Sequence, residues 1–179
     1  MFKTRRLVYA SFFIALSVAF TRILTIQIFI AGVGSVRLGF GPLPIILSGI
    51  FLGPLAGGII GTLADILGYL LNPMGGGYVP IITLVSTATG IIPPLILNML
   101  GERTQYRFVD LLISIGITQF VLALILMPMV LYKWFGVPIW INVPVRIVAQ
   151  AILIPIYTSI IHILTKRLPK AIPSFGKTL

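Results

Sequence analysis

The sequence has no cysteine and a single histidine, His162. A chain without cysteine has no disulfide framework and no thiolate chemistry, and one histidine gives little to hold a metal ion. The sequence also lacks a phosphate-binding loop, a zinc-protease motif and a serine-hydrolase motif. These absences argue against the common cysteine, zinc and serine enzymes. We expect a protein that is not an enzyme and that binds no metal or covalent cofactor.

Charge is scarce as well. Only 9% of the 179 residues are charged and 58% are hydrophobic, a balance that a soluble domain of this size could not cover with polar surface. The 13 basic residues outnumber the 3 acidic ones and give a net charge of +10, but they are spread between apolar runs. We therefore expect an integral membrane protein and no nucleic-acid partner.

Long apolar runs predict the architecture. A helix needs about 20 apolar residues to cross the hydrocarbon core of a bilayer. Six runs occur, the second of them short, at residues 7–25, 38–52, 55–71, 79–100, 109–131 and 142–164. We predict an all-α integral membrane protein, a single six-helix bundle that forms one domain over residues 1–179.

The basic residues predict how this bundle is oriented. An even number of spans places both termini on one side, and cytoplasmic loops are enriched in Lys and Arg. The nine basic residues on the terminal side are Lys3, Arg5, Arg6, Arg103, Arg107, Lys166, Arg167, Lys170 and Lys177, and the four on the other side are Arg22, Arg37, Lys133 and Arg146. Both termini are therefore predicted to be cytoplasmic.

Three ionisable residues fall within the predicted spans, in their outer halves: Arg22, Asp65 and Arg146. An ionisable group inside a bilayer costs at least a few kcal/mol, so each is a functional hypothesis. They belong to polar stripes at helical spacing. The stripes are Asn142, Arg146 and Gln150; Asp65, Tyr69 and Asn72; and Thr83 with Thr87, below Tyr78. We expect these stripes to line a cavity that opens outward.

The segment GYLLNPMGGGYVP, residues 68–80, interrupts the apolar pattern with Gly75, Gly76 and Gly77. Glycines bury no side chain and lose the most backbone entropy when ordered, so we expect this loop to supply backbone amides close to a ligand and to move aside to admit it. The loop around Arg37 and the loop 133–140, with Trp134 and Trp140, lie on the same predicted side. All three loops would cover the cavity.

The same residues also have structural explanations. Asp65 would neutralise internal charge by pairing with Arg22 or Arg146, Arg22 would snorkel to the interface, and Trp134 and Trp140 would form an interfacial aromatic belt. One acid among several outer bases still leaves a positive surplus, which favours an anionic ligand.

Two small-residue motifs let helix backbones approach each other. They are Gly57-x-x-x-Gly61 in the third predicted helix and Ala15-x-x-x-Ala19 in the first. Spacing alone favours internal packing over a partner site for both.

The stretch 36–84 contains the pattern Arg37-x-Gly39-Phe40, Pro44, Gly49, Gly53-Pro54, Gly61, Asp65, Gly68, Pro73, Tyr78-x-Pro80 and Thr83. In this pattern the chain resembles the substrate-binding S components of energy-coupling factor (ECF) vitamin transporters, in particular their folate-specific branch. The stretch PVRIVAQAILIPIYTSIIHILTKRL, residues 144–168, is similar to the final helix of that branch. Ala15-x-x-x-Ala19 is similar to the motif by which S components meet the transmembrane coupling protein.

The resemblance implies a vitamin-binding subunit of an ABC-type importer in a prokaryotic plasma membrane, with a coupling protein and two ATPases as partners that use ATP. Folate is the expected ligand. The resemblance and the polar stripes together indicate these binding residues: Arg22, Arg37, Asp65, Tyr69, Gly75, Gly76, Gly77, Tyr78, Thr83, Trp134, Trp140, Asn142, Arg146 and Gln150. The resemblance also implies that Ala15 and Ala19 contact the coupling protein.

One stretch departs from the resemblance. The folate branch usually carries a polar Asn and a Thr-Leu-Trp-like segment at the end of the fifth helix, where this chain reads LILMPMVLYKWFG, residues 124–136. Another water-soluble vitamin or precursor is therefore an alternative ligand. Two further alternatives are a self-sufficient proton-coupled carrier in which Asp65 titrates, and a membrane interaction protein without a ligand.

Overall fold

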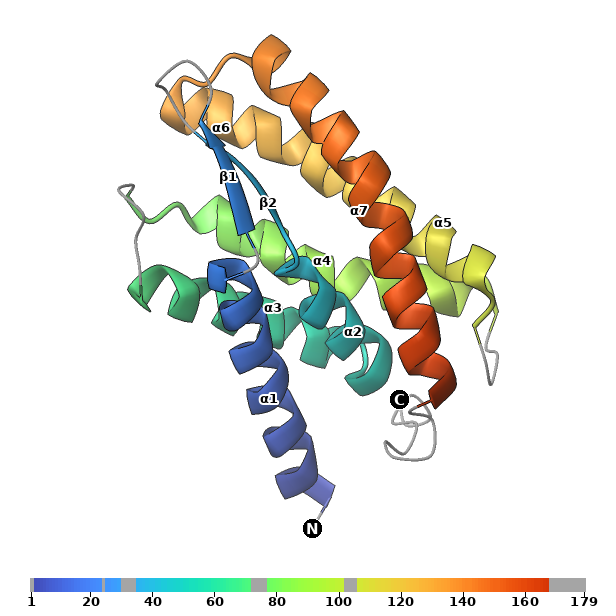
Figure 1. Cartoon of the computed structure of the whole chain (residues 1–179). Coiled ribbons are helices and arrows are strands. Elements are labelled where there is room, and N and C mark those ends of the chain that lie inside the picture. Colours follow the sequence, from blue (N-terminus) through green and yellow to red (C-terminus); the bar gives the residue numbers. More distant parts are fainter. Residues whose placement is uncertain (1, 24, 30–34, 72–76, 102–105, 168–179) are drawn as a thin grey trace.

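The computed structural model describes residues 2–23, 25–29, 35–71, 77–101 and 106–167 (Figure 1). The elements are α1 (Phe2–Ile23), β1 (Thr25–Phe29), β2 (Ser35–Gly39), α2 (Pro42–Leu52), α3 (Pro54–Leu71), α4 (Pro80–Met99), α5 (Phe108–Gln119), the π-helical segment η1 (Phe120–Leu126), α6 (Met127–Phe135) and α7 (Ile139–Arg167). Because α5, η1 and α6 follow one another without a break, they form one long helix.

Five helices in the described part of the chain are long and apolar enough to cross a membrane. They are α1, α3, α4, the α5–η1–α6 helix and α7. The remaining helix, α2, has 11 residues and so is only about 16 Å long, too short for a hydrocarbon core of about 30 Å. The predicted helical bundle is present, but its second run is not a full span.

A hairpin between α1 and α2 corrects the all-α prediction. Strands β1 and β2 pair antiparallel, from Thr25 opposite Gly39 to Phe29 opposite Ser35. The first predicted helix therefore ends at Ile23 before reaching Thr25, and Leu38, predicted as the start of the second helix, lies in β2. The alternating, β-branched sequence TIQIF favours a strand, and pairing with β2 satisfies its backbone groups.

The hairpin is attached to the last helix. The Tyr157 hydroxyl of α7 donates to the carbonyl oxygen of Gly39 at 2.6 Å, and the Tyr157 ring packs edge-on against Phe40 with ring centroids 6.0 Å apart. In Figure 1 the hairpin extends away from the start of α1 toward α6 and α7. Because it is attached to Tyr157, the hairpin links the end of α1 to the middle of α7.

Helices α2, α3 and α4 meet at glycines. A Cβ added to Gly90 of α4 would collide with the carbonyl of Gly57 in α3, and a Cβ added to Gly49 of α2 would collide with the carbonyl of Gly90. A Cβ on Gly61 would meet the carbonyl of Ser86 in the same way. The sequence prediction that Gly57 and Gly61 serve internal packing is confirmed, since helix backbones touch at both positions.

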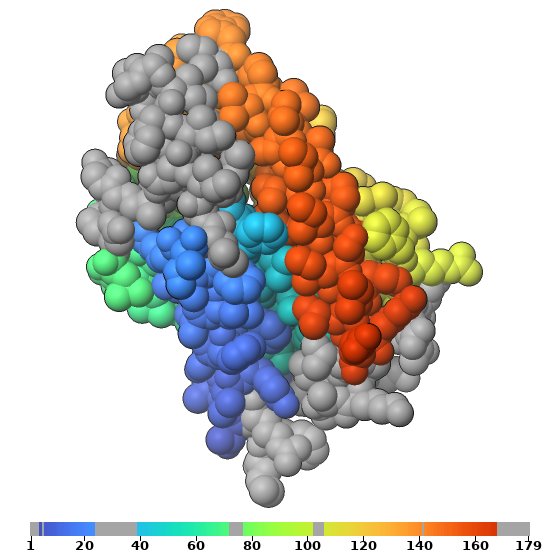
Figure 2. All heavy atoms as spheres, in the orientation of Figure 1, coloured from blue at the N-terminus to red at the C-terminus, as the bar shows by residue number. Residues whose placement is uncertain are grey.

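The apolar core joins this glycine-packed group to the other helices. Buried side chains of α2, including Ile46 and Leu47, belong to one core cluster with Leu111 and Ile115 of α5 and Ile161 of α7. Figure 2 shows α2 between α1 and α7 on the face that it presents, consistent with the contacts of α2 with both helices. The start of α1 and the end of α7 lie at the same end of the bundle (Figure 1).

Candidate functional site

Asp65 lies on α3 and faces polar side chains of α4. Its Oδ2 accepts a hydrogen bond from Thr83 Oγ1 at 2.7 Å, and its Oδ1 accepts one from Ser86 Oγ at 3.4 Å. The Tyr78 hydroxyl is hydrogen-bonded to Thr83 Oγ1 at 2.7 Å. The described contacts of Asp65 are with these hydroxyl groups, and none is an ion pair with Arg22 or Arg146. The predicted stripes on the two helices thus meet through hydrogen bonds.

Two neighbouring contacts extend this α3–α4 network. The rings of Tyr69 and Tyr78 pack against each other with centroids 5.3 Å apart. One helical turn beyond Thr83 in α4, Thr87 Oγ1 is hydrogen-bonded to Thr62 Oγ1 of α3 at 2.6 Å. Four predicted site residues, Asp65, Tyr69, Tyr78 and Thr83, therefore form one connected group.

Arg22 lies in the last turn of α1 and is half-buried. A Cβ added to Gly68 would lie 3.7 Å from its Nη2 atom, so the guanidinium packs against α3. Its Nε and Nη1 atoms are buried and have no hydrogen-bond partner among the described residues. A buried, unsatisfied charged donor costs about 1–3 kcal/mol or more, so this guanidinium is suited to receiving an acceptor from outside the chain.

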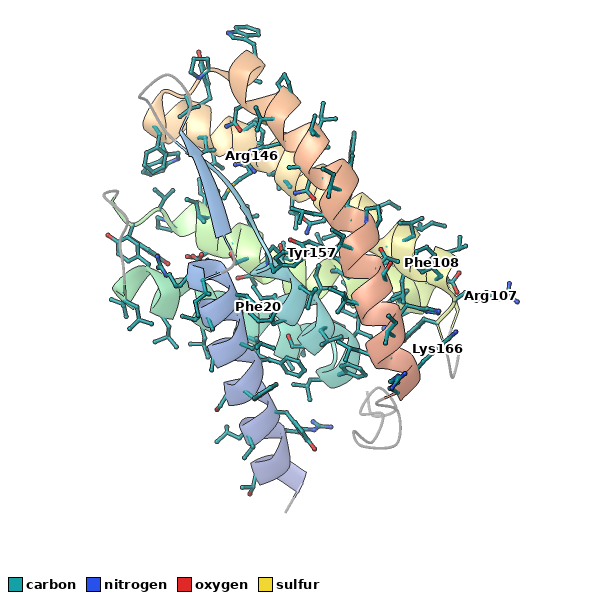
Figure 3. The ribbon with its side chains drawn as sticks, viewed as in Figure 1. Phe20, Arg107, Phe108, Arg146, Tyr157 and Lys166 are labelled. Atoms are coloured by element: carbon teal, nitrogen blue, oxygen red, sulfur yellow. The ribbon has the colours of Figure 1, made fainter. Side chains whose placement is uncertain are left out.

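Arg146 lies near the start of α7 and is 7% exposed. Its Nε donates to Asn142 Oδ1 at 2.7 Å, as expected for residues four apart on a helix. Its Nη1 makes a longer bond, 3.4 Å, to the carbonyl oxygen of Ala123 in η1. Figure 3 shows Arg146 in the region between α7 and the α5–η1–α6 helix. No described residue accepts from its Nη2.

Three amides in the same helices carry unsatisfied atoms. Asn142 is fully buried and its Nδ2 has no partner among the described residues. Gln150 Oε1, one of the predicted site atoms, is likewise buried and without a partner. Gln119 Nε2 is a third such atom, and Gln119 is only 3% exposed. The sequence analysis missed Gln119, although it is an amide in the middle of an apolar run.

The other predicted residues lie outside these contacts. Trp134 and Trp140 are 52% and 82% exposed. Gly77 is exposed and Arg37 pairs with Gln27 through the backbone of the hairpin. The side chain of Arg37, and Asn72, Gly75 and Gly76, lie outside the described part of the chain. On α1, Ala15 is exposed and Ala19 is half-buried.

The arrangement favours a particular class of ligand. Among the described residues, six buried side-chain atoms have no partner, and four of them are donors: Nε and Nη1 of Arg22, Nε2 of Gln119 and Nδ2 of Asn142. His162 Nδ1, toward the other end of α7, is a fifth such atom. Gln150 Oε1 adds one acceptor. Buried donors are normally hydrogen-bonded, and two guanidinium groups add positive charge. A ligand rich in acceptors and negatively charged would satisfy them.

Two comparisons with known proteins agree with the fold. The chain is 30% identical, over 162 residues, to "Folate transporter FolT" of Clostridium novyi (strain NT), a match that covers 90% of this chain and 88% of that protein. It also resembles the structure "Crystal structure of FolT bound with folic acid" with a TM-score of 0.75 and 24% identity, covering 92% of this chain and 96% of that one.

A second solved structure has the same fold. "Structure and mechanism of the S component of a bacterial ECF transporter" matches with a TM-score of 0.56 and 20% identity, covering 93% of this chain and 94% of that one. The family model described as "ECF-type riboflavin transporter, S component" matches residues 1–168. Because that match extends over nearly the whole sequence, the chain belongs to the S-component family of ECF-type riboflavin transporters.

Proposed function

We propose that this chain is a high-affinity folate-binding S component. The observation that carries the proposal is the set of buried polar atoms on α1, the α5–η1–α6 helix and α7 that have no partner among the described residues; most are donors, and they include Nε and Nη1 of Arg22. A folate has an acceptor-rich pterin and a glutamate tail with two carboxylates, which are the groups such donors bind. The 30% identity to a folate transporter supports the same ligand.

The candidate residues divide between the two ends of such a ligand. Arg22 and Arg146 would contact carboxylate or ring oxygens, and Asn142, Gln119 and Gln150 would hydrogen-bond the polar edge. Asp65, through its hydrogen bond with Thr83 and the bond of Thr83 with Tyr78, would keep the α3–α4 side of the site in place without contacting the ligand itself. The covering loops would include Arg37, Gly75, Gly76 and Gly77. Aromatic contacts would come from Tyr69, Trp134 and Trp140.

Calorimetry of the purified protein in detergent tests the ligand. We expect folic acid to bind much more tightly than riboflavin, because riboflavin is uncharged at neutral pH and has no carboxylate for the two guanidinium groups. The protein should first be freed of any co-purified vitamin. Riboflavin binding as tight as, or tighter than, folic acid binding would overturn the folate assignment.

We further propose that the chain forms one membrane domain in a prokaryotic plasma membrane, with both termini in the cytoplasm, and that it works with a transmembrane coupling protein and two ATPases. The excess of basic residues at the terminal side supports this orientation. The exposed Ala15 and half-buried Ala19 offer α1 as the surface that meets the coupling protein.

Substitution of Ala15 tests the partner surface. Ala15→Trp should leave folate binding unchanged and abolish ATP-dependent uptake in proteoliposomes that contain the complete transporter, because the larger side chain prevents close helix contact. Ala151→Trp, at an alanine of α7 that is also exposed, is the matched control and should transport normally. Uptake by the chain alone, without ATPases, would instead favour a proton-coupled carrier that uses Asp65.

A further inference from the structure

The contact between Arg146 and Ala123 depends on an irregularity in the helix that faces α7. At the end of η1, the Met127 N–H donates to the carbonyl of Leu122, five residues back. In a regular α-helix it would donate to Ala123 instead. At π-helical spacing the donor for Ala123 would be residue 128, which is a proline and has no N–H. The carbonyl of Ala123 therefore has no backbone donor at either spacing.

Pro128 also explains why the helix widens here. In a regular helix the proline ring would clash with the carbonyl of Leu124, and a π-helical turn relieves that clash. A free carbonyl in a membrane-spanning helix costs several kcal/mol unless another group satisfies it. Arg146 Nη1 donates to this carbonyl at 3.4 Å. The proline thus creates an acceptor, and the arginine of the neighbouring helix uses it.

This acceptor fixes the direction of the guanidinium. Asn142 Oδ1 holds Nε at 2.7 Å and the Ala123 carbonyl holds Nη1, so two of the three nitrogens are anchored to the protein. The group is planar and rigid, so two anchors orient its third nitrogen, Nη2, as well. Nη2 and the remaining N–H of Nη1 are left to form a fork for a carboxylate.

We propose that Pro128 is a positioning residue for ligand binding, because it frees the Ala123 carbonyl that orients the Arg146 guanidinium toward a carboxylate of the ligand. This inference rests on the proposed function, in which Arg146 binds an anionic vitamin. Pro128 does not touch the ligand in this scheme and acts only through Arg146.

The test is a double-mutant cycle on folic acid binding, measured by calorimetry. Pro128→Ala supplies the missing N–H, so the Ala123 carbonyl can return to the backbone ladder and release Arg146. We expect the Kd for folic acid to rise about tenfold, as for the loss of one hydrogen bond to a charged group. In an Arg146→Ala background the same change should have no further effect, because the two residues act as one unit.

A ligand without carboxylates separates positioning from general damage. The dimethyl ester of folic acid should bind the Pro128→Ala variant and the unaltered protein equally, whereas a distorted site would weaken both ligands. Pro155→Ala, an exposed proline within α7, is the matched control and should change neither Kd by more than about twofold. Additive effects of Pro128→Ala and Arg146→Ala, or an equal loss for both ligands, would overturn the inference.

These outcomes also separate the two proposals. If folic acid binds and Arg146→Ala weakens it while Pro128→Ala does not, the proposed function stands and the inference fails. If folic acid does not bind, the structure of the ligand-free Pro128→Ala variant still decides the inference. A regular α-helix over residues 120–128 without the Arg146–Ala123 bond supports it, and a persistent π-segment with that bond refutes it.

Discussion

The α3–α4 pair and the pair formed by α7 with the α5–η1–α6 helix both bury polar groups, but they satisfy them differently. In the first pair Asp65 accepts from Thr83 and Ser86, and Thr62 bonds Thr87, so the polar groups are bonded across the interface. In the second pair Gln119 Nε2, Asn142 Nδ2 and Gln150 Oε1 are buried and find no partner in the described part of the chain.

The backbones differ in the same sense. Helices α3 and α4 touch at Gly57, Gly61 and Gly90, which fixes their separation. The facing helix of the second pair changes from α to π and back around Pro128. Unpaired polar groups and irregular helices are both costly in a membrane and are found where a function requires them. The first pair therefore holds the fold together, and the second pair, with Arg22 of α1, is where we expect the ligand to bind.

The largest expected effect tests the close packing of the α3–α4 pair. Gly90→Ala should lower the free energy of unfolding by about 3 kcal/mol, because the new Cβ would meet the Gly57 carbonyl and the helices would have to separate. Equilibrium unfolding of the detergent-solubilised protein measures it. Gly116→Ala on α5, where nothing lies within 4 Å of the added Cβ, is the control and should be neutral or slightly stabilising. Equal effects of the two substitutions would remove the distinction between the pairs.

The next effect tests ligand binding by the pair that α7 forms with the α5–η1–α6 helix. Arg146→Ala should weaken folic acid binding by about 1.5–3 kcal/mol in calorimetry, because it removes a charge-assisted hydrogen bond to the ligand. Arg167→Ala, at the exposed end of α7, is the control and should bind as the unaltered protein does. Unchanged affinity of the Arg146 variant would exclude this arginine from the site.

A third effect has opposite signs for stability and binding. Gln119→Leu removes a buried donor for which the described residues offer no acceptor, so it should stabilise the ligand-free protein by about 1 kcal/mol. If Gln119 bonds the ligand, the same change should weaken folic acid binding by about the same amount. Thr118→Val is the matched control, since Thr118 is equally buried but bonds the Ser114 carbonyl at 2.8 Å. A destabilised Gln119→Leu variant would show that the amide is satisfied in the protein.

Sequence patterns predicted the two pairs unequally. The apolar runs predicted every long helix, and the spacing of Gly57 and Gly61 predicted a close helix contact, because both features are local. The partner glycines Gly49 and Gly90 carry no such spacing signal, since their role depends on which helices meet. The hairpin was missed because the search for apolar runs took Leu38 as helical, although strand pairing satisfies its backbone equally well.

The candidate site was predicted where helical spacing alone determines a contact. Asn142 and Arg146 are four residues apart, so the stripe placed them on one helix face, and in the structure their side chains are hydrogen-bonded. The bond from Arg146 to Ala123 could not be predicted, because it depends on the π-helical turn and on the packing of a second helix. Asp65 bonds Thr83 rather than an arginine for a similar reason. The glycine contacts between α3 and α4 bring Thr83 next to Asp65, and that packing depends on two separate helices.

The smallest expected effect tests whether the α3–α4 pair stabilises the fold without contacting the ligand. Tyr78→Phe keeps the ring that packs against Tyr69 and removes only the hydroxyl bonded to Thr83. We expect a loss of about 0.5–1 kcal/mol in the free energy of unfolding, because Tyr78 is 42% exposed and water replaces part of the bond. Folic acid affinity should fall by no more than this amount. A much larger loss of affinity than of stability would mean that the Asp65–Thr83–Tyr78 group contacts the ligand directly, and the site would then extend across both helix pairs.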